Sequence, residues 1–279
     1  MTAPYPVDAH DATGEAGTVR YDANLSILFT ELPLRRRAEA ARAAGFTAVE
    51  YWWPFDTAAP GDREVDEFVR SVADAGVTLA GLNFFADDLA AGHRGIVSWI
   101  GREKELADSV DIAVGIAGQL GCRTFNALYG NRIDGQEPAA QDEHALSTLD
   151  SAAAAAAGIG ARLAIEPLSG ADRYPLRTAA DALAVLDKLG RDNVTLLFDL
   201  YHLGTNGDDL DAVIERHTPR IGHVQVADVP GRQEPGTGTL DITGYLAKLA
   251  SAGYDGYVGL EYRPSGRTED SFGWLEGQR

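Results

Sequence analysis

Short apolar runs alternate with longer segments of helical periodicity along most of the chain. Each run is rich in Val, Ile, Leu, Phe or Tyr, as is typical of strands that are buried on both faces. Eight such runs predict strands, at residues 23–28, 48–52, 78–82, 124–128, 163–166, 195–199, 222–225 and 258–261.

The segments between these runs place apolar residues on one face of a helix, and several are followed by glycine, a common helix terminator. They predict helices at residues 33–44, 64–75, 103–120, 147–157, 178–189, 208–216 and 242–252. Eight strands that alternate with helices, at about 35 residues per unit, favour a (β/α)8 TIM barrel. A doubly wound open sheet is the alternative, but the chain lacks both the Gly-x-Gly-x-x-Gly and the Walker-type phosphate loops.

The first twenty residues are polar and lack periodicity. We therefore interpret residues 1–20 as a flexible arm. No Pro- or Gly-rich linker divides the rest of the chain, so we expect residues 21–279 to form a single barrel domain.

Composition narrows the class of protein. The chain of 279 residues has 42 acidic and 24 basic residues, a formal charge of −18. This charge disfavours nucleic acid and anionic membrane surfaces as partners, because both need clustered Lys and Arg. No apolar run approaches the about 20 residues that span a bilayer, no secretory signal is visible, and the single cysteine, Cys122, cannot form an internal disulfide. We expect a cytoplasmic protein, and homo-oligomer formation stays open.

Four strands in the second half of the chain end in oxygen-bearing side chains, namely Glu166, Asp199, Gln225 and Glu261. Each is one βα unit from the next. Because the carboxyl ends of barrel strands form the mouth where active sites lie, we expect these four side chains to meet there. Three carboxylates in one place repel one another unless a cation compensates. Together with one amide oxygen they form an all-oxygen site that suits Mg²⁺ or Mn²⁺.

Several motifs identify a family. The chain resembles the hydroxypyruvate isomerases of the xylose-isomerase-like TIM barrel superfamily. The resemblance covers nearly everything after the arm and is carried by residues 23–29 (ANLSILF), 45–50 (GFTAVE), 90–96 (AAGHRGI), 101–103 (GRE), 165–167 (IEP), 198–202 (FDLYH), 221–228 (IGHVQVAD), 230–238 (PGRQEPGTG) and 253–264 (GYDGYVGLEYRP).

The resemblance implies a metal held by Glu166, Asp199, Gln225 and Glu261, with Glu166 and Glu261 also acting as the acid/base pair. It also implies interconversion of hydroxypyruvate and tartronate semialdehyde (2-hydroxy-3-oxopropanoate) through a cis-enediolate. Related sugar epimerases usually have His at the position of Gln225, so the amide favours the hydroxypyruvate branch. His202, expected on the loop after Asp199, would donate to a substrate oxygen.

Other residues have ordinary structural interpretations beside functional ones. Arg232 is the best candidate for binding a substrate carboxylate through its planar guanidinium, although an exposed structural arginine is an equal alternative. His223 points inward one layer below Gln225, where a hydrogen-bonded core histidine is expected. Glu50 could face the barrel interior, but the sequence does not indicate which residue would pair with it. The residues after the second and third strands could exclude water from the mouth, with packing between helix and barrel as an equal alternative for each: Trp52, Trp53, Asn83, Phe84 and Phe85.

Some positions depart from the family pattern. Thr239 and Arg263 stand where Glu and Lys are usual, and the loop after Glu166 is shorter than usual. These loops line the mouth, so a larger small-molecule hydroxy or oxo acid, or a sugar, is the alternative substrate: the chain would then be a 2-oxo-tetronate isomerase or a tagatose 3-epimerase-like enzyme. Phosphodiester-cleaving relatives hold several metals with many histidines, which the six scattered His and the charge of −18 disfavour. A non-enzymatic binding barrel is the third alternative.

Overall fold

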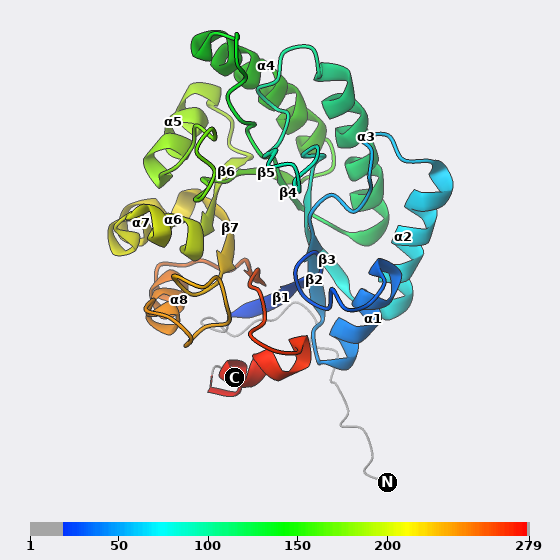
Figure 1. The fold of residues 1–279 in the computed structure, drawn as a ribbon, viewed down its shortest axis with the longest axis vertical. Helices are drawn as coiled ribbons and strands as arrows, with labels where there is room; N and C mark the ends of the chain where they lie inside the picture. The colour runs from blue at the N-terminus through cyan, green and yellow to red at the C-terminus, as the bar shows by residue number, and fades with distance from the viewer. Residues whose placement is uncertain (1–18, 278–279) are drawn as a thin grey trace.

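A computed structural model describes residues 19–277 of the chain. In it eight parallel strands close into a barrel in sequence order, which confirms the predicted (β/α)8 TIM barrel. Figure 1 shows the strands at the centre and the helices around them. The strands are β1 (Arg20–Asn24), β2 (Ala48–Tyr51), β3 (Thr78–Asn83), β4 (Thr124–Asn126), β5 (Arg162–Ile165), β6 (Val194–Asp199), β7 (Ile221–Val226) and β8 (Tyr257–Leu260).

The first strand differs from its prediction. The apolar run predicts residues 23–28, but β1 begins at Arg20, which pairs with Tyr257 of β8 and so closes the barrel. It ends at Asn24 because the chain then turns: the amide of Leu28 donates to the carbonyl of Asn24 at 2.9 Å. The predicted arm therefore ends before residue 20, and its residues 1–18 lie outside the described part of the chain.

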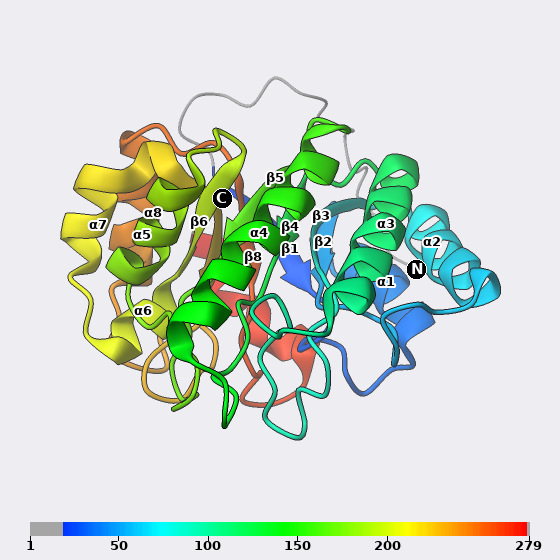
Figure 2. The ribbon, with the colours of Figure 1, turned by 90° about the horizontal axis from the view of Figure 1, so that it is seen from above.

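Helices flank every strand (Figure 2). They are α1 (Leu34–Ala43), α2 (Asp62–Ala75), α3 (Glu103–Leu120), α4 (Pro138–Ala157), α5 (Ala179–Leu189), α6 (Leu200–Asn206), α7 (Leu210–His217) and α8 (Ile242–Ser251), with two 3-10 helices, η1 (Thr218–Arg220) and η2 (Thr268–Gly277). The sequence missed α6 and η2, and it predicted only the alanine-rich second half of α4. No helix among residues 19–277 is long and apolar enough to cross a bilayer.

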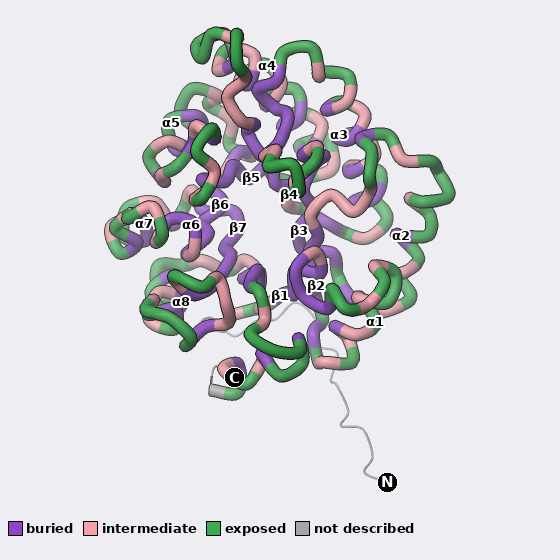
Figure 3. Tube along the Cα trace, in the orientation of Figure 1, coloured by how far each residue is buried: buried purple, intermediate pink, exposed green. Residues whose placement is uncertain are grey.

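The hydrophobic core lies between the barrel and its helices, where Figure 3 shows the buried backbone concentrated in the strands and the inner sides of the helices. The barrel interior is different, because polar side chains are buried there. Asp22, Glu50 and His223 form a cluster inside the strands, and all three are at most 3% exposed. Buried polar groups cost free energy unless they are hydrogen-bonded, so this interior is built for more than packing.

Candidate active site

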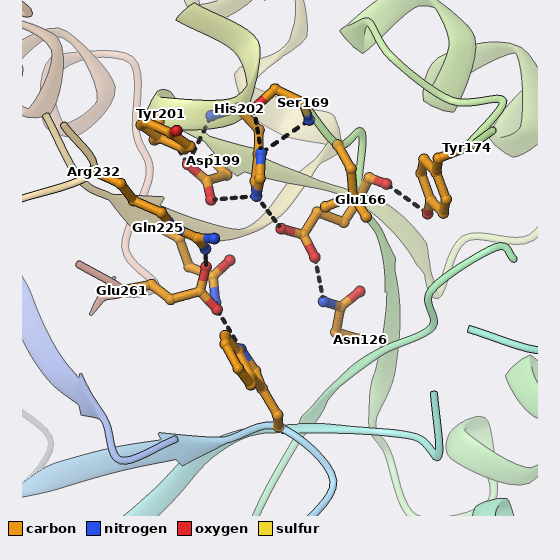
Figure 4. Close-up of polar contacts among 12 residues, drawn as sticks. Asn126, Glu166, Ser169, Tyr174, Asp199, Tyr201, His202, Gln225, Arg232 and Glu261 are labelled. Atoms are coloured by element: carbon orange, nitrogen blue, oxygen red, sulfur yellow. Dashed lines mark hydrogen bonds and ion pairs between the residues drawn. The ribbon is translucent and has the colours of Figure 1, made fainter. Parts of the chain in front are cut away.

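The four side chains predicted at strand ends come together at the mouth of the barrel. Asp199 ends β6 and pairs in register with Gln225 of β7, while Glu166 and Glu261 directly follow β5 and β8. All four are at most 4% exposed. One oxygen each of Glu166, Asp199 and Glu261 and one ring nitrogen of His202 lie within 4.8 Å of one another. Figure 4 shows their side chains converging from neighbouring strands.

Asp199 also caps the helix that the sequence missed. Its Oδ1 accepts from the amides of Tyr201, at 2.7 Å, and His202, at 3.2 Å. Such an acceptor is the usual way to satisfy the free N–H groups at a helix start. His202 therefore lies in α6 and not, as predicted, on a loop. The cap leaves Oδ2 of Asp199 facing the cluster, 3.8 Å from His202 Nε2.

The hydrogen bonds of His202 define which nitrogen carries its proton. The amide of Ser169 donates to Nδ1 at 2.9 Å, so Nδ1 is an acceptor and Nε2 holds the hydrogen. Burial lowers the pKa of this ring well below its usual value, and the nearby cations of Arg232 and Arg94 lower it further. His202 is thus a neutral donor whose Nε2 points at the carboxylates, 3.9 Å from Glu166 Oε1.

The carboxylates cannot all be ionised without compensation. Burial raises the pKa of Glu166 well above its usual value, and the charges of Glu261 and Asp199 raise it further. Burial and the Glu261 carboxylate raise the pKa of Asp199 to about 7. Burial also raises the pKa of Glu261, although the Arg232 guanidinium opposes that rise. Removing two or three protons from this cluster requires a positive charge in their place.

The donor atoms fit a divalent cation. Gln225 Oε1 is buried and has no hydrogen-bond partner among the described residues, although such atoms are normally satisfied. It belongs to the same group of strand ends as the three carboxylates. Oxygen donors of this kind are the ligands that hard cations such as Mg²⁺ and Mn²⁺ prefer.

Donors from several strands and loops orient Glu261. Trp52 Nε1 donates to its Oε1 at 2.5 Å, and Asn24 Nδ2 donates to the same atom at 3.0 Å. Arg232 donates to its Oε2 in an ion pair. The guanidinium of Arg232 also lies over the ring of Tyr201, 5.3 Å from its centre. Trp52 thus has a specific polar contact, whereas the sequence analysis considered exclusion of water or packing for it.

Glu166 is oriented by a residue that the sequence analysis missed. Asn126, the last residue of β4, donates from Nδ2 to Glu166 Oε2 at 2.6 Å. The carbonyl of Glu166 accepts from the hydroxyl of the buried Tyr174 at 2.9 Å. The sequence hid this signal, because the strand predicted at residues 124–128 puts Asn126 in its interior, whereas β4 ends at Asn126.

The rim of the mouth contains a second arginine. Arg94 follows β3 and is close enough to His202 and Arg232 to affect the pKa of the first and be affected by the second. Its two described hydrogen bonds go to the carbonyls of Leu89 and His93, and it has no carboxylate partner among residues 19–277. Beside this rim, a cavity of about 410 Å³ is lined by Trp53, Phe55, Asp56, Phe85, Ala86, Asp87, Asp88 and Leu89.

The chain is similar to known proteins in both sequence and structure. Residues 38–278 match the sequence model of the family described as xylose isomerase-like TIM barrel. A Streptomyces coelicolor protein named "Putative hydroxypyruvate isomerase" is 50% identical over 265 residues, which cover 92% of this chain and 95% of that protein. The 2-oxo-tetronate isomerase of Cupriavidus necator is 34% identical over 260 residues, 92% and 97% of the two chains. The crystal structure of an AP endonuclease, family 2, from Brucella melitensis superposes with a TM-score of 0.86 at 35% identity and covers 94% of this chain and 100% of its own.

Proposed function

The chain belongs to the xylose isomerase-like TIM barrel family, and from that premise we propose that it isomerises hydroxypyruvate to tartronate semialdehyde with a divalent cation, Mg²⁺ or Mn²⁺. The 50% identical relative carries the name of this activity. The ligands in this proposal are Glu166, Asp199, Gln225 and Glu261. The single observation that carries it is the buried group of three carboxylates in one small volume, with the unpartnered amide oxygen of Gln225 on a residue that pairs with one of them, Asp199.

The reaction moves one proton between adjacent carbons. One carboxylate of the pair Glu166 and Glu261 removes a proton from C3 of hydroxypyruvate, which leaves an enediolate, and the other delivers a proton to C2. The hydroxyl proton of O3 passes to O2 at the same time, so that C3 becomes the aldehyde and C2 the alcohol. A divalent cation, when bound, supplies positive charge for the two vicinal oxygens that become negative. The two acids come from different strands, so they can flank the carbon pair from separate directions.

The remaining side chains orient and neutralise the substrate. The Nε2–H of the neutral His202 ring can donate a hydrogen bond to a developing oxyanion. Arg232 is already paired with Glu261, so a substrate carboxylate near it would share the guanidinium. Arg94, which lacks a carboxylate partner among the described residues, is the second candidate for this anion.

Deuterium exchange tests the proposal directly. The protein is loaded with Mg²⁺ or Mn²⁺, incubated with hydroxypyruvate in D₂O and followed by NMR. We expect tartronate semialdehyde to form with deuterium on carbon. Absence of both exchange and product would contradict the isomerase proposal. Exchange that survives in both Glu166→Gln and Glu261→Gln would contradict the acid/base assignment while leaving the activity in place.

A larger 2-oxo acid is the second candidate, and the 34% identical 2-oxo-tetronate isomerase of Cupriavidus necator favours it. The same proton transfer applies, with additional carbons beyond the reacting pair. Comparing kcat/KM for hydroxypyruvate and a four-carbon 2-oxo acid separates the two. The name of the Brucella melitensis structure would require a DNA substrate, which a chain of formal charge −18 attracts poorly because DNA binding depends on neutralising phosphates.

A further inference from the structure

The amide of Gln225 has one satisfied end and one free end. Its Nε2 donates to Glu50 Oε1 at 2.7 Å and approaches Glu261 Oε1 at 3.4 Å. Its Oε1 is buried without a partner among the described residues. The NH₂ group is therefore turned towards acidic oxygens inside the barrel, and the carbonyl oxygen is the end left for a ligand.

Glu50 is itself held on both carboxylate oxygens. Asn24 Nδ2 donates to Oε1 at 2.9 Å, and His223 Nε2 lies 2.6 Å from Oε2. The burial that would lower the pKa of His223 is outweighed by the Glu50 carboxylate, which raises it. The predicted core histidine is thus a partner of Glu50. Two glycines make room for this carboxylate: a Cβ at Gly259 would lie 2.5 Å from Glu50 Oε1, and one at Gly81 would lie 3.1 Å from Oε2.

Backbone geometry also aims Glu50 inward. The pairing register of β2 with β3 shifts between Val49 and Glu50, so that Glu50 pairs with Gly81. Irregularities of this kind re-aim a side chain relative to a regular strand. The result is an acceptor within hydrogen-bonding distance of the Gln225 amide.

The orientation of an amide matters for a cation because its two ends have opposite polarity. An oxygen that faces the cation attracts it, whereas an NH₂ group would repel it and cannot act as a ligand. We propose that Glu50 is a positioning residue that holds the NH₂ group of Gln225 and thereby presents Oε1 to the divalent cation. This inference rests on the proposed function, because it assumes that the cluster binds a cation.

Histidine ligands offer a parallel for this role. Metal-bound imidazoles usually donate their second N–H to a carboxylate, and loss of such a partner commonly lowers metal affinity about 10- to 100-fold. Here Glu50 serves an amide in the same way. A carboxylate suits the position because it accepts hydrogen bonds on both oxygens, whereas a glutamine would keep only one acceptor.

Three variants test the inference. Glu50→Leu removes the acceptor at similar size, and Glu50→Gln keeps one acceptor oxygen. Asp22→Asn is the matched control, because Asp22 belongs to the same buried cluster but makes no described hydrogen bond to Gln225. Burial raises the pKa of Asp22 well above its usual value, so Asn resembles its neutral form.

Two readouts apply to each variant: the Kd for Mn²⁺, measured by EPR of the free ion, and the side-chain ¹⁵N–H signals of Gln225 in the metal-free protein. We expect Glu50→Leu to weaken Mn²⁺ binding about 10- to 100-fold and to expose the Gln225 NH₂ to rapid hydrogen exchange. Glu50→Gln should lie between it and the wild type. Asp22→Asn should change neither readout by more than about twofold, a small effect for a change outside the ligand contacts.

The outcomes separate the inference from the proposed function. Unchanged Mn²⁺ affinity and unchanged NH₂ protection in folded Glu50→Gln would overturn the inference, even if Glu50→Leu fails to fold. An equal loss of affinity in Asp22→Asn would also overturn it, since the effect would then belong to the cluster as a whole. A wild type that binds no Mn²⁺ would overturn the proposed function, while the NH₂ signals would still report whether Glu50 holds the amide.

Discussion

The two halves of the barrel place different kinds of side chain at its mouth. The acids and the glutamine that we propose as ligands lie at or next to the carboxyl ends of β5 to β8, whereas β1, β3 and β4 end in asparagines. Two of these asparagines donate to acids on the adjacent strand: Asn126 to Glu166, and Asn24 to Glu261. The second half therefore supplies the proposed ligands, and the first half supplies hydrogen bonds that orient two of them. Removing a carboxylate should lower the activity more than removing the asparagine that donates to it, so substitutions can test this comparison.

Glu166→Gln is expected to have the largest effect, because it removes a proposed acid/base group from the charged half. Proton transfer by a positioned side chain contributes about 10²- to 10⁴-fold to a rate. We expect kcat for hydroxypyruvate to fall by that range, measured by product NMR, with an unchanged far-UV CD spectrum. Glu215→Gln on the exposed side of α7 serves as control. A variant with more than a tenth of wild-type kcat would place the chemistry elsewhere.

Asn126→Leu removes the hydrogen bond that orients Glu166 and leaves the carboxylate itself in place. The hydrogen bond of Asn126 to Glu166, at 2.6 Å, joins an amide to an ionisable group. Such bonds contribute about 1.5–3 kcal/mol, so we expect kcat to fall about tenfold or more, but less than in Glu166→Gln. The same kinetic assay measures it. An effect equal to that of Glu166→Gln would show that orientation and charge are inseparable at this position.

Each half also contributes one arginine near the mouth, Arg94 after β3 and Arg232 after β7. Arg94 lacks a carboxylate partner among the described residues, while Arg232 is paired with Glu261. We expect Arg94→Met to raise KM for hydroxypyruvate about tenfold, consistent with loss of one charge-assisted hydrogen bond. Arg63→Met, an exposed position on α2, should leave KM unchanged. A normal KM in Arg94→Met would leave Arg232 as the sole anion partner.

The smallest effect concerns stability and pH in the metal-free protein. Burial and the Glu261 carboxylate raise the pKa of Asp199 to about 7 in the folded state. The folded protein then keeps a proton that the unfolded chain releases at lower pH, so the free energy of unfolding should fall as pH rises towards 7. We expect the melting temperature to fall less in Asp199→Asn than in the wild type as the pH rises from the ordinary pKa of an aspartate, 3.8, to about 7. Mn²⁺ should raise the wild-type melting temperature more at pH 7 than at pH 5; a pH-independent difference would contradict this.

Much of the fold could be predicted because its signals are local. The apolar runs of β2 to β8 and the glycine after helices such as α3 predict elements to within a few residues. The failures have physical causes. Residues 25–28 are mostly apolar, like a strand, but the barrel closes through Arg20 instead. Pairing between strands that are distant in sequence is invisible in a local pattern. Helix α6 is short and depends on a cap from Asp199, a residue that reads equally well as a metal ligand.

The sequence by itself determined the fold class and the identity of the chemical groups. A polar residue at the carboxyl end of an apolar strand lies at the mouth of the barrel, because all the strands are parallel. Only the tertiary structure decided how those groups face one another. That His202 is a neutral donor follows from Ser169, and that Gln225 turns its oxygen outward follows from Glu50, a partner 175 residues away. Hydrogen bonds of this kind depend on direction and on distances of a few ångströms, which spacing along the chain does not encode.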